Sequence, residues 1–215
     1  MAEEGEAFVD ARQRASAHIT GDAGARAALP DRQQVEAALR EHLRNTEGEQ
    51  YAERLKALRL HALEWMQRLA RFEPHLVGAV LNGSATRHAH LHLHLFADSA
   101  KDVEMFLLDQ GVDIGVDAPQ GDDARAQECI GFLDTARSAG GPARAAATGI
   151  LLTVYDLGAL RVAPPARLRP VDPALHPVER SGRANLAMVR ALLDYGTQHL
   201  CQPGGAAAAY DGLPR

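Results

Sequence analysis

The chain has 215 residues, a mass of 23.1 kDa, a net charge of −5 at pH 7 and a pI near 6.0. Its hydrophobic content of 46% is sufficient for a globular core. The acidic balance excludes the broad basic surface of a general nucleic-acid-binding protein, and no apolar run approaches the ~18 residues that span a membrane. The N-terminus lacks the layout of a signal peptide. We therefore expect a cytoplasmic protein without a membrane partner, and the composition leaves a homo-oligomer open.

The N-terminal third divides into two segments. Residues 1–29 have no sustained apolar period and are predicted to be largely disordered or weakly helical. Residues 30–73 form a helical section, in which Asp31 is the N-cap of a first helix and a second helix runs from about residue 50 to residue 72. Both helices carry an apolar stripe, so we expect an antiparallel pair with Trp65 in the core.

Residues 74–162 are predicted to form the central α/β core. The predicted strands cover residues 76–81, 87–96, 112–116, 126–133 and 150–155, with a corner at 82–84 and a helix at 99–110. Strands that alternate with helices after a helical section favour an α/β or α+β domain built around a small mixed sheet.

The C-terminal part of the chain begins with a proline-rich stretch. Residues 163–201 combine this extended connection with a last helix, predicted from Ser181 to Tyr195 with Gly196 as its end. The tail, residues 202–215, is predicted to be disordered.

The most unusual feature is a run of histidines at every second position. His88, His90, His92 and His94 alternate with alanine and leucine. Because side chains in a β-strand alternate between its two faces, this spacing predicts one strand with four imidazoles on one face and an apolar opposite face. Three interpretations follow: a metal or catalytic site, a solvated polar face, or a buried or interfacial histidine network.

An apolar strand ends in Gly83-Ser84, and a second strand with alternating side chains follows after a short turn. With this layout, the segment from residue 76 to residue 116 resembles the nucleotidyltransferase superfamily, the DNA polymerase β-like fold. The resemblance implies a small mixed sheet of the nucleotidyltransferase type, with nucleotide phosphates at Gly83 and Ser84. Arg87 is a further candidate contact for phosphate.

In that family an Asp-x-Asp pair and a third carboxylate from a neighbouring strand hold two magnesium ions. His90 and His92 stand where the resemblance places the two aspartates, and His94 follows on the same face. Asp113 is the first candidate for the third carboxylate, and Asp156 is the alternative. Imidazole is a poor ligand for magnesium and favours zinc, nickel or copper. We therefore expect a divalent transition metal rather than magnesium at these residues.

Two functions follow from the resemblance and its departures. The first is transfer of a nucleotidyl or phosphoryl group from an NTP, with an atypical histidine-bound metal. The second is a catalytically inactive module of the same fold that binds a transition metal or a protein partner. The ligand is a nucleotide or another small molecule in the first case. Uptake of the metal is expected to weaken below about pH 6, where ordinary histidines become protonated.

Overall fold

The computed structural model describes residues 30–118, 125–134, 147–164, 169–170 and 172–200, with side chains as far as residue 195. The predictions for residues 1–29 and 202–215 lie outside these residues. No helix in the described ranges is both long enough and apolar enough to cross a bilayer.

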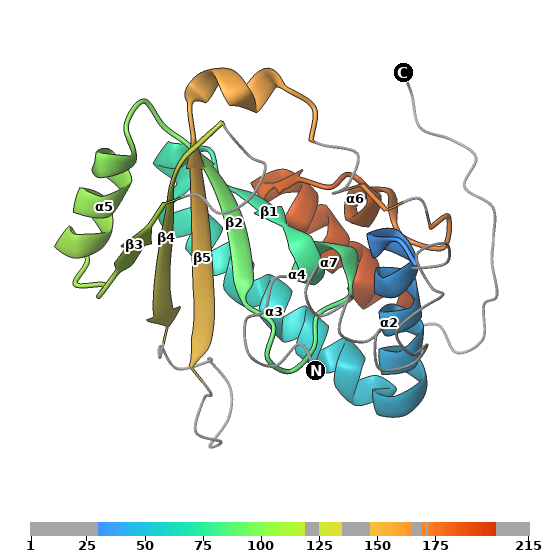
Figure 1. Ribbon diagram of the computed structural model, residues 1–215. Helices are drawn as coiled ribbons and strands as arrows, with labels where there is room; N and C mark the ends of the chain where they lie inside the picture. Colours follow the sequence, from blue (N-terminus) through green and yellow to red (C-terminus); the bar gives the residue numbers. More distant parts are fainter. Residues whose placement is uncertain (1–29, 119–124, 135–146, 165–168, 171, 201–215) are drawn as a thin grey trace, which may run out of the picture.

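A six-stranded mixed sheet forms the centre of the molecule, in the order β3-β4-β5-β2-β1-β6 (Figure 1). β2 and β5 pair in parallel, and every other neighbouring pair is antiparallel. With helices before and after the sheet strands, the chain belongs to the α+β class, as predicted. The strands are β1 (His75–Val77), β2 (Leu91–Phe96), β3 (Gly115–Asp117), β4 (Ala126–Asp134), β5 (Thr148–Tyr155) and β6 (Ala184–Asn185).

The helices lie on one face of this sheet and at both of its sides. Figure 1 shows α3 crossing behind the sheet, α5 on the β3 side, and α2 and α7 on the β1 side. The helices are α2 (Arg32–Glu47), α3 (Glu49–Arg68), α4 (Gly78–Asn82), α5 (Ala100–Asp109), α6 (Pro177–Arg180) and α7 (Leu186–Leu200), with short 3-10 helices η2 (Ala70–Phe72) and η3 (Leu157–Arg161).

Local sequence signals set the boundaries of the first two helices. The Asp31 carboxylate accepts from the backbone N–H of Gln34, and the Gln34 side chain accepts from the Asp31 N–H, which forms a capping box. Gly48, with a φ of +51°, ends α2 and directly precedes α3. The predicted helical pair is confirmed, and the Trp65 side chain on α3 is buried.

The hydrophobic core lies on the leucine face of β2. Leu91, Leu93 and Leu95 are completely buried. The parallel register places them beside the apolar face of β5, and α3, α5 and α7 contribute apolar side chains to the same core. Each such side chain contributes about 1.5–3 kcal/mol of burial free energy. The predicted helix at 99–110 is confirmed as α5, whose Val103 and Leu107 are fully buried in the same core, but α5 packs beside β4, and α3 is the helix that lies against β2.

Three predicted strands are shorter than expected. The strand predicted at 76–81 ends at Val77, because Gly78 adopts a φ of +71° and the chain then turns into the short helix α4. The strand predicted at 87–96 begins only at Leu91, because the Ala89 N–H bonds to the carbonyl of Thr86 in a turn. The edge strand β3 starts at Gly115 rather than at Val112.

The last helix also differs from the prediction. Ser181 follows α6 instead of starting a long helix, and the chain then adds β6 to the edge of β1. The side chain of Asn185 accepts from the Met188 N–H at 3.0 Å, so this residue caps the start of α7. α7 continues through Gly196 to Leu200.

Candidate functional site: the His92–His94 pair and the Gly83–Ser84 corner

The face of the sheet opposite the leucine core carries two of the four alternating histidines. His92, His94 and Phe96 alternate with the buried leucines along β2. The parallel register pairs His92 with Leu151, His94 with Thr153 and Phe96 with Tyr155. Residues paired in register point to the same face, so this face joins imidazoles, a hydroxyl and aromatic rings.

His92 is half-buried, and one ring nitrogen is held by a neighbouring strand. Its Nε2 lies 2.9 Å from the hydroxyl Oγ1 of Thr153 on β5. Nδ1 has no hydrogen-bond partner within the described part of the chain. Burial lowers the pKa of His92 to about 4, and the positive charge of Arg32 on α2 adds to the shift. His92 is therefore a neutral imidazole at physiological pH.

His94 lies next to His92 and is more deeply buried. The centroids of the two imidazole rings are 5.3 Å apart, with an edge-on arrangement of 73°. The ring of His94 also packs against Tyr155 at 4.8 Å. The two histidines thus form a compact pair on this face of the sheet.

His75, which the sequence did not single out, faces this pair from β1. Its Cα is the register partner of His94. Its Nδ1 lies 2.8 Å from the carbonyl of Glu73, and its ring packs edge-on against Phe96 at 5.3 Å. Burial lowers the pKa of His75, partly offset by that carbonyl. Only the antiparallel register of β1 and β2 brings it here, and no local sequence pattern shows that pairing.

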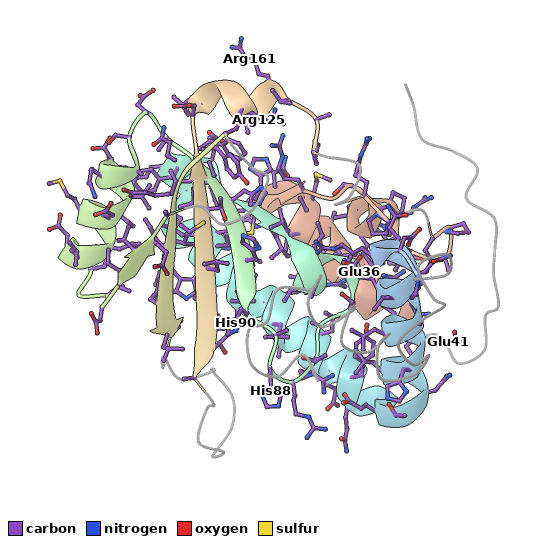
Figure 2. All side chains as sticks on the ribbon, in the orientation of Figure 1. Glu36, Glu41, His88, His90, Arg125 and Arg161 are labelled. Carbon is purple, nitrogen blue, oxygen red and sulfur yellow. The ribbon has the colours of Figure 1, made fainter. Side chains whose placement is uncertain are left out.

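His88 and His90 lie outside the strand. Figure 2 shows both side chains at the lower end of β2, where the chain enters the sheet. His88 and His90 are exposed. The ring of His90 packs over Gly149, since a Cβ on that glycine would lie only 2.0 Å from the His90 Nδ1. The four-histidine ladder is therefore reduced to a pair by the turn before β2.

The two candidate third carboxylates are not gathered at the pair. Asp113 is exposed just before β3, and β4 and β5 lie between β3 and β2, a separation of about 14 Å at ordinary strand spacing. Asp156 is exposed beyond the end of β5, where it accepts from the Gln127 side chain at 2.6 Å. In the described ranges of the chain, no three His, Cys, Asp or Glu side chains already form a metal-binding group.

Thr153 connects the histidine pair to a cysteine. The sulfur of Cys129 on β4 lies 3.9 Å from the same Oγ1 that contacts His92. Cys129 is half-buried and free. The sequence analysis did not identify Thr153, because the sequence predicted the strand at 150–155 but not the order of the strands in the sheet.

The Gly83–Ser84 corner is occupied by its own hydrogen bonds. Both the backbone N–H and the hydroxyl of Ser84 donate to the side-chain oxygen of Asn82, at 3.0 and 2.7 Å. The carbonyl of Gly83 accepts from the hydroxyl of Tyr51. Gly83 has a φ of +80°, and a Cβ there would lie 3.2 Å from the Tyr51 oxygen. The donors that the sequence assigned to phosphate are thus engaged within the protein.

Three arginine–carboxylate pairs surround this corner. Arg32 pairs with Glu36 at 2.8 Å, and Glu36 in turn accepts from Asn82 at 3.1 Å. The second pair joins Arg40 to Asp172 at 3.0 Å, and the third joins Arg59 to Glu179 at 2.6 Å. Figure 2 shows Glu36 on α2, on the side of the sheet away from α5. The network ties α2, α3, α4 and α6 together.

Arg59 and Arg87, both near this corner, differ strongly in burial. Arg59 is buried and also donates to the carbonyls of Val80 and Leu81. Its position could have been inferred, because it lies four residues from both Leu55 and Leu63 on the apolar stripe of α3. The predicted phosphate contact Arg87 is instead 71% exposed and 3.9 Å from Glu47.

Comparison with known proteins gives no assignment. No protein-family model, no curated protein and no solved structure matches the chain. The functional argument therefore depends on the residues themselves.

Proposed function

We propose that this protein is a transition-metal-binding α+β module in which His92 and His94 supply the protein ligands. The observation that carries the proposal is the state of His92. It is a half-buried, neutral imidazole with one nitrogen fixed by Thr153 and the other without a partner in the described ranges. A metal requires this neutral form of histidine.

The hydrogen bond to Thr153 supports Nδ1 as the ligating atom. Metal-binding histidines usually donate their second ring N–H to an oxygen, which fixes the tautomer and the ring orientation. In the tautomer that carries the proton on Nε2, His92 donates to the Thr153 hydroxyl and directs the Nδ1 lone pair away from β5. Two imidazoles without a carboxylate favour zinc, nickel or copper over magnesium.

Titration calorimetry with zinc, nickel and magnesium tests this proposal. The untagged parent is expected to bind about one zinc or nickel ion and no magnesium. The double variant His92→Ala with His94→Ala should lose binding. His42→Ala, on the exposed surface of α2, and His90→Ala should keep it. Equal zinc uptake by parent and double variant would overturn the proposal.

A second candidate is nucleotidyl or phosphoryl transfer from an NTP, with phosphates near Gly83, Ser84 and Arg87. The strand arrangement favours it: β1 leads into the corner, β2 follows, and the neighbouring β5 places Thr153 beside His92. The resemblance places a third metal-binding side chain on such a neighbouring strand. Because the Ser84 donors already bond to Asn82, we expect only weak nucleotide binding.

Calorimetric titration with ATP, in the presence and absence of magnesium, tests the second candidate. Binding that Ser84→Ala and Arg87→Ala both weaken would support it. Absence of heat at millimolar ATP under both conditions would exclude it and leave metal binding unaffected.

A further inference from the structure

Arg40 is almost completely buried at the Gly83–Ser84 corner, and most of its hydrogen-bonding capacity is unused. Its exposed fraction is 1%. One nitrogen, Nη2, donates to Asp172 at 3.0 Å. The Nε and Nη1 atoms are inaccessible to solvent and have no hydrogen-bond partner. A buried donor without an acceptor is unfavourable, and a charged donor more so.

The other two arginines of the corner do not share this deficit. Arg59 donates to two carbonyls and to Glu179. Arg32 pairs with Glu36 and has further interactions. The unused donors are therefore specific to Arg40 among the three corner arginines, and they point to an additional acceptor at this place.

The Arg40 side chain packs against Gly83 of the corner, and a second positive charge, that of Arg44, lies nearby. The Arg40 Cδ lies 3.5 Å from the position of a Cβ on Gly83, so the side chain packs in ordinary van der Waals contact with the corner. The positive charge of Arg44, exposed one turn further along α2, acts on both Tyr51 and Asp172. The side chain of Asp172 is 27% exposed, whereas the side chain of its partner Arg40 is 2% exposed. Two arginines thus face one carboxylate.

We propose that Arg40 and Arg44 bind a phosphate-type oxyanion in the position that the Asp172 carboxylate occupies in this structure. An external carboxylate would gain little by replacing the Asp172 carboxylate, because the two carry the same charge. A phosphate group carries more negative charge and more acceptor oxygens, so it can displace Asp172 from Nη2 and also reach an unused donor. Arg40 and Arg44 lie on α2, outside residues 76–116, the segment that resembles the nucleotidyltransferases.

The site does not depend on the metal proposed for His92 and His94. It also uses neither the Ser84 donors nor Arg87. The shared chemistry is a phosphoryl oxyanion, either free phosphate or the phosphate group of a small molecule.

Binding of inorganic phosphate to the full chain tests the proposal, with acetate and chloride at matched ionic strength as controls. We expect phosphate alone to give a saturable heat in calorimetry and to raise the melting temperature. Asp172→Asn removes the competing carboxylate and should tighten phosphate binding about tenfold, the equivalent of one charge-assisted hydrogen bond. Arg40→Lys should weaken it. Glucose 6-phosphate in a further titration distinguishes a phosphorylated small molecule from free phosphate.

Asp172→Asn keeps the test valid even if Arg40 variants do not fold. No specific effect of phosphate on the parent or on Asp172→Asn would overturn the proposal, and the unused donors would then be satisfied by buried water. An equal effect of acetate and phosphate would overturn the assignment to phosphate.

Discussion

The His92–His94 pair and the Gly83–Ser84 corner are both polar, but they solve the problem of burial in opposite ways. At the corner, a carboxylate pairs with each of three arginines, the Ser84 donors are internally bonded, and Arg40 alone among these three arginines keeps unused donors. At the histidine pair, burial lowers the pKa of His92 and so keeps its ring uncharged. The paired charges hold the helices together, whereas the unused nitrogen of a neutral imidazole can ligate a metal.

The largest expected effect on stability is the loss of the Arg59 interactions at the Gly83–Ser84 corner. Arg59→Ala leaves Glu179 and two carbonyls without their donor, and breaking a buried ion pair typically costs about 3–5 kcal/mol. Urea denaturation of the variant should show this loss of unfolding free energy. Lys56→Ala, at an exposed position of the same helix, should change it by less than about 0.5 kcal/mol. A similar small change for both variants would show that the corner pairs are not structural.

The next effect concerns the charge state of the histidine pair. The pKa of His92 is lowered from 6.5 to about 4 in the folded protein, so the unfolded chain binds this proton more tightly. The stabilising contribution is complete above about pH 6.5 and is lost as the pH falls toward 4, by up to roughly 3 kcal/mol.

Urea denaturation between pH 7 and pH 4 measures this contribution. The parent should lose more stability over this range than His92→Gln, which cannot titrate. Parallel pH profiles would contradict the buried neutral state of His92. The same shift implies that protons compete with a metal at His92 at a lower pH than the value near 6 expected from sequence.

A smaller effect separates the ligand from the residue that orients it. Thr153→Val removes the partner of the His92 Nε2, and loss of such an orienting hydrogen bond typically lowers metal affinity about 10–100-fold. Thr153→Ser should retain most of the affinity, because it keeps the hydroxyl. Zinc titration of both variants measures the two affinities. Equal zinc affinities of Thr153→Val and Thr153→Ser would show that the Thr153 hydroxyl does not orient His92.

The smallest effect compares two glycines with positive φ. Gly83→Ala adds backbone strain and a contact of 3.2 Å with the Tyr51 oxygen, whereas Gly48→Ala adds strain alone, with nothing within 4 Å. We expect Gly83→Ala to cost about 1–2 kcal/mol more than Gly48→Ala. Equal melting temperatures would mean that the corner tolerates a side chain and is less tightly packed than described.

Local sequence signals predicted the elements that local interactions determine. The capping side chain of Asp31 and the stop at Gly48 define α2, and the Ser99 side chain caps α5. The leucines of β2 predicted its buried face correctly. The alternation failed at its start, because a period of two continues through Thr86–His90 although the backbone there forms a turn.

The candidate site required information that no short segment contains. The order of the strands places Thr153 beside His92 and separates Asp113 from it by two strands. The antiparallel register of β1 brings His75 opposite His94. The arginines of α2 and α3 meet the corner only after the helices pack, so their role could not be read from the corner sequence.

The most direct measurement of the central proposal is imidazole ¹⁵N NMR of the labelled protein during a zinc titration. In the metal-free protein at pH 7, His92 should be neutral, with its proton on Nε2. Zinc should shift the Nδ1 resonance of His92 together with one ring nitrogen of His94, and leave His42 unchanged. A titration in which only the exposed His88 and His90 respond, or in which His92 is protonated at pH 7, would contradict the account.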